Sequence, residues 1–259
     1  MKVEFNRAAL WEALGLLTSV VPSRTPKPIL QCVHIIAGEK TVRISATDLE
    51  VGLNCEISEV QVKQPGEAVL PAHRLAPIVR ESADEVLSFE AAEGLCQIRG
   101  SDSRFTIYGH EPSQYPAVPG FDGGADVEVG LEELQLGIEQ TLFAAARESS
   151  RYAINGVLWE MKGRKLLLVA TDGRRLARAK VNLARSASEQ EPRKEAEQLE
   201  TTKVIVPAKT MALLDKIGTG DEDNVAIRFA DNQILLRCAN VVICSSLVEG
   251  NFPKYEDII

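Results

Sequence analysis

Two aspartates in matching settings are the residues of this chain best suited to do chemistry. Asp48 and Asp172 each end the tripeptide Ala-Thr-Asp, directly after an alternating apolar segment. A carboxylate in such a position could hold a divalent metal for hydrolysis, as in a nuclease or phosphatase. A Thr-Asp pair that leaves a strand can also close a turn through hydrogen bonds between its side chains and the backbone. We expect the turn and keep the metal enzyme as an alternative.

The other residue types that commonly do chemistry form no recognisable set. His34, His73 and His110 lack the spacing of a metal site, and His34 lies in an alternating segment where a structural role is expected. There is no Gly-x-Ser-x-Gly motif and no group of serine, histidine and aspartate that would pair a nucleophile with its base. We therefore predict no catalytic residue, no metal and no cofactor.

The segments that carry the two aspartates are copies of each other. Pro28 to Asp48 reads PILQCVHIIAGEKTVRISATD, and Tyr152 to Asp172 reads YAINGVLWEMKGRKLLLVATD. The two align without a gap, and each has an alternating apolar strand, a Gly-containing turn and a second alternating strand. This pattern predicts a β-hairpin in each copy.

Helices are expected on both sides of each hairpin. A proline followed by helical spacing marks a helix after Pro71 and after Pro207. Amphipathic helices are also expected ahead of the hairpins, at 7–20 and 131–148. The fold class is therefore α+β, with tandem repeated domains that each have an antiparallel sheet and two helices on one face.

The repeat also sets the expected domain boundaries. We expect a first domain at 1–120, a linker at 121–126, a second domain at 127–250, and at 251–259 the start of a linker to a further copy. The second copy carries a polar insertion at 184–202, which is typical of a surface loop.

Composition limits the classes of function. The 259 residues carry a formal net charge of −8, whereas tight binding to the DNA backbone is driven by lysine and arginine. Five single cysteines without a CxxC pair indicate a reducing compartment, and we expect a cytoplasmic protein. Because no long apolar run is present, we expect no signal peptide and no membrane span.

The chain resembles the bacterial DNA polymerase III beta subunit family, the DNA sliding clamps. The resemblance covers essentially the whole chain, and the order and spacing of its motifs are more specific than any one of them. They are MKVEFNR at the start, Arg24 with Pro28-Ile29-Leu30, Ala46-Thr47-Asp48-Leu49-Glu50, Arg151-Tyr152, Asn155-Gly156, Ala170 to Ala177, Val204 to Pro207, and Leu247 to Tyr255.

The resemblance implies a noncatalytic accessory subunit of the polymerase. Family chains have three copies of one fold, and two chains close head to tail into a ring around duplex DNA. A third copy would then be missing after Ile259. Because a ring holds DNA topologically, few phosphate contacts are needed and the acidic charge is no obstacle. The implied partners are double-stranded DNA, the DNA polymerase III alpha subunit, the clamp loader, other proteins with a clamp-binding motif, and a second clamp chain.

Three sets of site residues are implied by the same resemblance. The DNA-contact set is Arg24, Lys27, His73, Arg74, Arg80, Arg151, Tyr152 and Lys209. The partner-peptide groove, which takes a short extended peptide with hydrophobic anchors, is Ile154, Thr171, Gly173, Arg174, Arg175, Leu176, Pro253 and Ile258. The dimer interface is Arg74, Ile78, Arg104, Phe105 and Ile107. Ala153 and Glu148 depart from the family pattern and weaken the expected single-strand contact beside Tyr152.

Two alternatives stay open. A complete two-domain clamp could close as a trimer, since three pairs of domains also make a ring of six. A metal-dependent enzyme could use Asp48 or Asp172.

Overall fold

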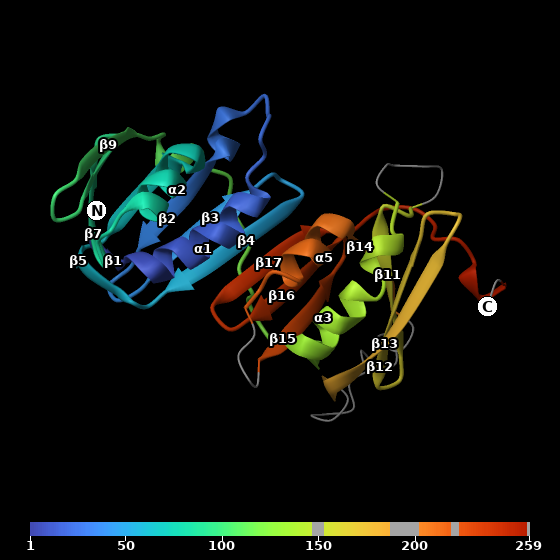
Figure 1. Ribbon diagram of the computed structural model, residues 1–259. Coiled ribbons are helices and arrows are strands. Elements are labelled where there is room, and N and C mark those ends of the chain that lie inside the picture. The colour runs from blue at the N-terminus through green and yellow to red at the C-terminus, as the bar shows by residue number, and fades with distance from the viewer. Residues whose placement is uncertain (147–152, 187–201, 219–222, 258–259) are drawn as a thin grey trace. The chain divides into compact units, whose positions relative to one another are not determined.

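The chain divides into two compact units, which are described separately. The computed structural model describes residues 1–146, 153–186, 202–218 and 223–257 (Figure 1). Unit 1 consists of Met1–Gly120 with Asn240–Val242, and unit 2 of Phe121–Ala239 with Ile243–Ile259. The division between the two falls directly after Gly120.

Unit 1 is built mainly from antiparallel strands. One sheet has the order β5-β1-β7-β8-β9, and a second series of paired strands has the order β4-β3-β2-β6. The elements are β1 (Lys2–Asn6), α1 (Arg7–Val20), η1 (Pro28–Gln31), β2 (Cys32–Ala37), β3 (Val42–Thr47), β4 (Val51–Ile57), β5 (Val60–Gln64), β6 (Gly66–Pro71), α2 (Ala72–Glu81), β7 (Val86–Ala92), β8 (Leu95–Arg99), β9 (Arg104–Tyr108) and η2 (Pro112–Gln114).

Unit 2 repeats this plan. Its strands follow the order β14-β11-β12-β13-β10-β15-β16-β17. The elements are β10 (Val127–Gly130), α3 (Leu131–Glu139), η3 (Leu142–Ala144), β11 (Gly156–Lys162), β12 (Lys165–Thr171), β13 (Leu176–Ser186), β14 (Lys203–Pro207), α5 (Ala208–Leu214), β15 (Asn224–Ala230), β16 (Gln233–Cys238), β17 (Val241–Ser246) and η5 (Tyr255–Asp257).

Both predicted hairpins are confirmed, and they share one register. In unit 1, β2 pairs with β3 so that His34 lies opposite Ser45. In unit 2, β11 pairs with β12 so that Leu158 lies opposite Val169. Leu158 aligns with His34 in the sequence repeat, and Val169 aligns with Ser45. Equivalent residues therefore pair in both hairpins, and the repeat in sequence is also a repeat in structure.

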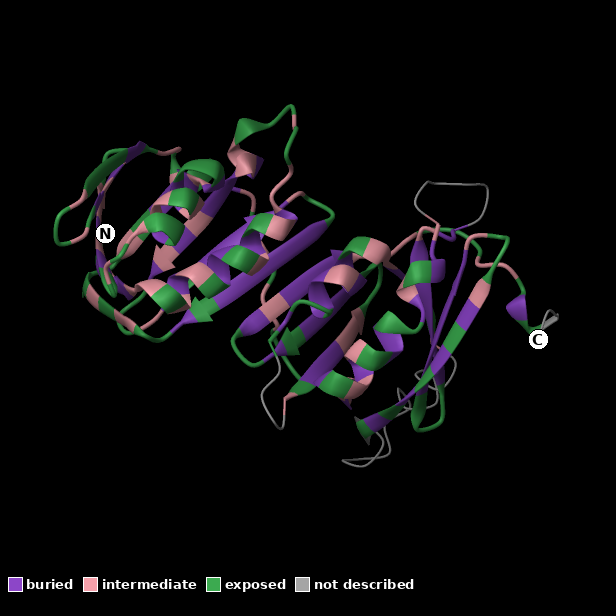
Figure 2. Ribbon diagram, in the orientation of Figure 1, coloured by how far each residue is buried: buried purple, intermediate pink, exposed green. Residues whose placement is uncertain are grey.

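The helices of each unit cover one face of its strands, as predicted. In Figures 1 and 2, α1 and α2 lie side by side over β2, β3 and β4, whose ribbons are buried along most of their length. The core side of α1 carries Leu10, Leu14 and Leu17, all fully buried. Asn6 caps this helix by accepting a hydrogen bond from the Ala9 N–H at 3.1 Å, which explains why it begins at Arg7.

The helix predicted at 131–148 is shorter than the periodicity indicated. α3 ends at Glu139, and the chain turns into the short 3-10 helix η3. The buried hydroxyl of Thr141 donates to the Gly137 carbonyl at 2.7 Å and so competes for a helical acceptor. The prediction was therefore wrong for residues 140–146, and 147–148, including Glu148, lie outside the described residues.

Among the elements that were not predicted are two short strands and a 3-10 helix. β1 and β10 precede the first helix of each unit, and η1 occupies 28–31, so the first strand of the hairpin begins at Cys32. Strands of four or five residues have too few positions for alternation to stand out. Within the described residues, no helix is both long enough and apolar enough to cross a lipid bilayer.

Candidate functional site

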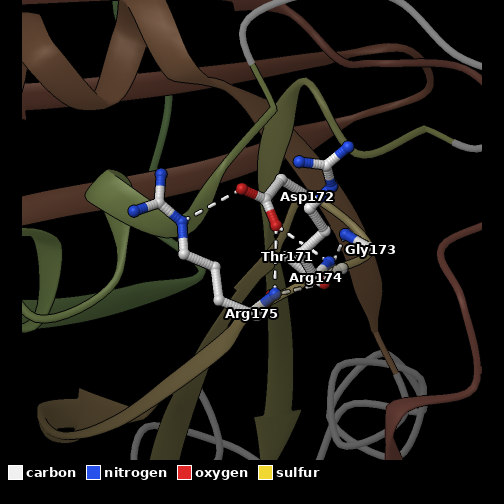
Figure 3. A network of polar contacts seen from close by, with 5 residues as sticks. All are labelled: Thr171, Asp172, Gly173, Arg174 and Arg175. Carbon is white, nitrogen blue, oxygen red and sulfur yellow. Dashed lines mark hydrogen bonds and ion pairs between the residues drawn. The ribbon is translucent and has the colours of Figure 1, made fainter.

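A tight corner connects β12 to β13 in unit 2 (Figure 3). The Thr171 hydroxyl donates to the Arg175 carbonyl at 2.7 Å and accepts from the Gly173 N–H at 3.0 Å. The carboxylate of Asp172 accepts from the N–H groups of Arg174 and Arg175, both at 3.0 Å. Gly173 has a φ of 84°, a left-handed conformation that glycine adopts without strain.

The corner between β3 and β4 in unit 1 has the same hydrogen bonds. The Thr47 hydroxyl donates to the Val51 carbonyl at 3.0 Å and accepts from the Leu49 N–H at 3.0 Å. Asp48 Oδ1 accepts from the N–H groups of Glu50 and Val51 at 2.9 and 2.7 Å. The prediction that both Thr-Asp pairs close turns is therefore confirmed. In the part of the chain that the structure describes, no group of three or more His, Cys, Asp or Glu side chains is arranged to hold a metal ion.

Side chains distinguish the two corners. Where unit 1 has Leu49, Glu50 and Val51, unit 2 has Gly173, Arg174 and Arg175. The Arg174 and Arg175 side chains extend to different sides of Asp172, and Arg175 reaches toward η3 (Figure 3).

Arg175 is oriented from two sides. Its Nε donates to Asp172 Oδ2 at 3.0 Å, and its Cζ lies 5.6 Å from the centroid of the Phe143 ring. Hydrogen bonds from the N–H groups of Arg174 and Arg175, aided by the Arg175 guanidinium, hold the pKa of Asp172 below its usual value. The ring of Phe143 is 59% exposed. The corner therefore presents a guanidinium beside an accessible aromatic face.

An apolar cluster lies next to the corner. Three half-buried side chains, Leu176, Val248 and Phe252, pack against its buried members, which are Ala153, Leu158, Val169, Ile205 and Tyr255. The cluster joins β11, β12, β13 and β14 to the segment 247–256, which follows β17. Apolar surface beside arginine stems is suited to take hydrophobic anchors of another chain.

A buried carboxylate adjoins this cluster. Glu160 on β11 is 3% exposed, accepts the hydroxyl hydrogen of Tyr255, and lies 2.7 Å from Lys203 Nζ and 3.2 Å from Lys162 Nζ. Burial raises the pKa of Glu160, but hydrogen bonds from Lys203, Tyr255 and Lys162 outweigh it, so that the net pKa is lowered. Burial and the bond to Glu160 raise the pKa of the Tyr255 hydroxyl. Glu160 is thus an anion held by three donors.

The predicted groove residues are gathered only in part. Thr171, Gly173, Arg174, Arg175 and Leu176 lie together at the corner, and Leu176 packs on the apolar cluster. Ile154 is buried, and its carbonyl accepts from the Ala146 N–H at 2.9 Å. Pro253 lies half-buried in the segment 247–256. Ile258 is outside the described residues.

The predicted DNA-contact residues that the structure describes are all exposed. Arg24 and Lys27 lie between α1 and η1; His73, Arg74 and Arg80 lie on α2; and Lys209 lies on α5. Arg80 Nε donates to Glu81 Oε1 at 2.7 Å, so part of its charge is balanced locally. Arg151 and Tyr152 are outside the described residues.

Four of the five predicted interface residues, all but Arg104, line one hollow of unit 1. Its volume is about 610 Å³, and its lining from α2 and β9 includes His73, Arg74, Ile78, Phe105 and Ile107. Phe105 is 40% exposed, whereas Ile107 is buried and contributes mainly to the core. The guanidinium of Arg104 donates to Gln97 Oε1 at 2.8 Å on the neighbouring strand β8.

The sequence interpretation missed several residues of this site. Phe143, Glu160, Val248, Phe252 and Tyr255 were not assigned to it, although they contact its members. The repeat held a usable signal for one of them, because Phe252 aligns with Tyr115. That tyrosine is buried on Cys32 and Val69, at the corresponding place in unit 1.

Comparisons with known proteins agree over both units. Residues 1–119 match the family model described as DNA polymerase III beta subunit, N-terminal domain. Residues 128–254 match the model of the central domain of the same subunit.

Individual relatives and structures are similar over the whole chain. The beta sliding clamp of Pseudomonas aeruginosa is 30% identical over 260 aligned residues, which span all of this chain and 68% of that protein. The crystal structure of the sliding clamp from Bacillus subtilis superposes with a TM-score of 0.90 at 27% identity, covering all of this chain and 67% of that one. A Pseudomonas aeruginosa sliding clamp bound to griselimycin superposes at 0.88 with 28% identity, covering all of this chain and 68% of that one. The chain therefore spans about two thirds of the length of these relatives.

Proposed function

The chain belongs to the DNA polymerase III beta subunit family of sliding clamps, and we propose that it tethers partner proteins to duplex DNA without catalysing a reaction itself. The observation that carries the proposal is the difference between the two copies of one corner. Both copies keep the Thr-Asp hydrogen bonds, but only the second places two arginines beside a half-exposed leucine and an apolar cluster. Such a surface suits binding and supplies no nucleophile or metal ligand set.

Partner proteins would bind at this second corner. A short extended peptide would insert hydrophobic anchors beside Leu176, while the stems of Arg174 and Arg175 cover its flanks and their guanidinium groups stay hydrated. The proposed groove comprises Ile154, Thr171, Gly173, Arg174, Arg175, Leu176, Pro253 and Ile258. Its proposed ligands are the DNA polymerase III alpha subunit, the clamp loader and other proteins with a clamp-binding motif.

DNA would be held mainly by encirclement. A few exposed cations on the helices and their loops, among them Arg24, Arg80 and Lys209, are enough to steer the duplex. The net charge of −8 disfavours tight phosphate binding, which would impede sliding. We propose that the protein acts in the cytoplasm, in agreement with its five free cysteines, which are all buried.

Ring closure would use the hollow between α2 and β9. Ile78 and Phe105 offer apolar surface there, rimmed by His73 and Arg74. Sedimentation velocity of the chain and of an Ile78→Asp, Phe105→Ser double variant tests this use. A species near three times 28.3 kDa would favour the two-domain trimer. Loss of any association in the variant, with an unchanged circular dichroism spectrum, supports the hollow as the interface.

The groove is tested with griselimycin as the probe, because it is the compound bound in the similar Pseudomonas aeruginosa structure. In a two-dimensional NMR titration of the labelled chain, we expect shifts of amides around Gly173 and Leu176. Leu176→Ala should weaken binding about tenfold, since burying a leucine side chain contributes up to about 2 kcal/mol.

The unit 1 corner provides the matched control. Leu49→Ala changes an exposed side chain at the equivalent corner and should leave griselimycin binding unchanged. Shifts confined to residues around Leu49, or equal losses in the two variants, would contradict the groove assignment.

A further inference from the structure

The segment 247–256 is fastened to unit 2 at one place near its start and at another near its end, and between them the Ala153 N–H donates to the Asn251 carbonyl at 3.3 Å. Near its start, the Val248 N–H donates to the Ile205 carbonyl at 2.9 Å and the Leu247 N–H to the Asn232 carbonyl at 3.0 Å. Near its end, the Tyr255 hydroxyl donates to Glu160, and Glu256 lies 3.5 Å from Lys203 Nζ. Pro253, a proposed groove residue, lies between the two attachments.

The second attachment involves a charge that is expensive to bury. Glu160 is 3% exposed, and an unpaired carboxylate in such a place would be strongly destabilising. Lys162 and Lys203 balance the charge from the surface, and the Tyr255 hydroxyl supplies a further hydrogen bond from inside. Tyr255 is thereby held in one orientation, because its hydroxyl and its ring are both fixed.

The ring of Tyr255 supports the side chains that a partner would touch. It is 3% exposed and belongs to the cluster against which Leu176 and Val248 pack. A displacement of this ring would disturb the buried cluster, which forms the floor of the proposed groove and against which Leu176 packs. The Glu160–Tyr255 bond therefore bears on the shape of the groove, although neither residue is exposed.

In unit 1, the segment that leaves the unit is held without a buried carboxylate. The residue aligned with Glu160 is Ile36, so no carboxylate is present there. The outgoing segment of unit 1 is held by the Tyr115 hydroxyl, which donates to the Cys32 carbonyl at 3.1 Å, and by Asn54 Nδ2, which donates to the Pro119 carbonyl at 2.9 Å. A buried ionic attachment thus accompanies the arginine-bearing corner and is replaced by neutral hydrogen bonds in the other copy.

We propose that Glu160 and Tyr255 are positioning residues for partner binding, and that the hydrogen bond between them holds the segment 247–256 and the floor of the groove in the binding-competent arrangement. This inference rests on the proposed peptide groove at Leu176. It adds that binding strength depends on a buried hydroxyl that no ligand touches.

The test is Tyr255→Phe, which removes the hydroxyl and keeps the ring that the core requires. We expect griselimycin to bind about fivefold more weakly, because the variant loses the net contribution of roughly one hydrogen bond to the binding-competent arrangement. Amide hydrogens of residues 247–256 should also exchange faster with solvent in the free variant, whereas those of β12 should not. The second readout separates a loosened segment from general destabilisation.

Tyr115→Phe is the control, because it removes the buried tyrosine hydroxyl that holds the outgoing segment of unit 1. It should leave griselimycin affinity within about twofold of the unmodified chain. Equal weakening by both variants, or unchanged affinity in Tyr255→Phe while Leu176→Ala loses binding, would overturn the positioning role and leave the groove intact. If the unmodified chain does not bind griselimycin at all, the proposed groove fails and the inference fails with it.

Discussion

Asp172 binds Arg175 twice, through the backbone N–H at 3.0 Å and through the side-chain Nε at 3.0 Å. One carboxylate therefore closes the corner and also aims the guanidinium beside Phe143. In unit 1 the equivalent Asp48 makes the backbone bond to Val51, which has no cation to orient. The two aspartates that the sequence marks as best suited to do chemistry thus share a structural role, and the second has an additional one.

Asp172→Asn should keep the turn and loosen Arg175. The amide oxygen can still accept from the two N–H groups, but the ion pair with Arg175 is lost. We expect little change in the unfolding temperature and a roughly two- to threefold loss of griselimycin affinity, since exposed ion pairs contribute little to stability and mainly orient the side chain here. Asp48→Asn is the control and should not change the affinity. A divalent-metal-dependent nuclease or phosphatase activity that Asp172→Asn abolishes would instead favour the enzyme alternative.

Adding a side chain at Gly173 should lower the stability of the protein, whereas removing the side chain of Leu49 at the equivalent corner should raise it. Gly173 and Leu49 have nearly the same left-handed φ, 84° and 80°. Gly173→Ala should destabilise unit 2 by about 1 kcal/mol through backbone strain alone, because an added Cβ meets nothing within 4 Å. Leu49→Gly should stabilise unit 1 by roughly 0.5 kcal/mol, as relief of strain exceeds the entropy gained by the unfolded chain. Urea unfolding measures both, and a loss of stability in Leu49→Gly would contradict the argument.

Replacing each of two helical glycines with alanine should change the stability of the protein in opposite directions. A Cβ on Gly137 of α3 would lie 2.7 Å from Val181 Cγ2 and 2.9 Å from Leu168 Cδ1, so Gly137→Ala should cost about 1–3 kcal/mol. Gly15 of α1 is exposed with nothing near its Cβ, so Gly15→Ala should stabilise by about 0.5–1 kcal/mol through helix propensity. Thermal unfolding of the two variants checks this. A stabilising Gly137→Ala would mean that α3 can move away from β12 and β13 at little cost.

Stability should fall in acid partly because of Glu160. Its pKa in the folded protein is lowered, as the hydrogen bonds from Lys203, Tyr255 and Lys162 outweigh burial, which raises it. A lowered folded-state pKa contributes stability that is present above the pKa of the unfolded chain and is lost as the pH falls through the folded-state value. Urea unfolding at about pH 7 and about pH 3.5 should therefore show a smaller acid loss for Glu160→Gln than for the unmodified chain. Equal losses would indicate that Glu160 keeps its ordinary affinity for protons.

Much of the fold was predictable because its signals are local or repeated. The hairpins 32–47 and 156–171, the start of α1 at Arg7 and the Thr-Asp turns all follow from alternation, capping and side chains that bond within four residues. The end of α3 was not predictable from periodicity, because the hydroxyl of Thr141 bonds back to Gly137 while the apolar spacing continues.

The sequence by itself determined that one unit occurs twice, that each copy turns at Ala-Thr-Asp, and that the second turn carries Arg174 and Arg175. Only the tertiary structure decided that Phe143 lies under Arg175 and that Tyr255 reaches Glu160, 95 positions earlier in the chain. Turns and strands arise from neighbours along the backbone, whereas these contacts depend on how distant strands pair and which side chains they bury. No local pattern specifies that outcome.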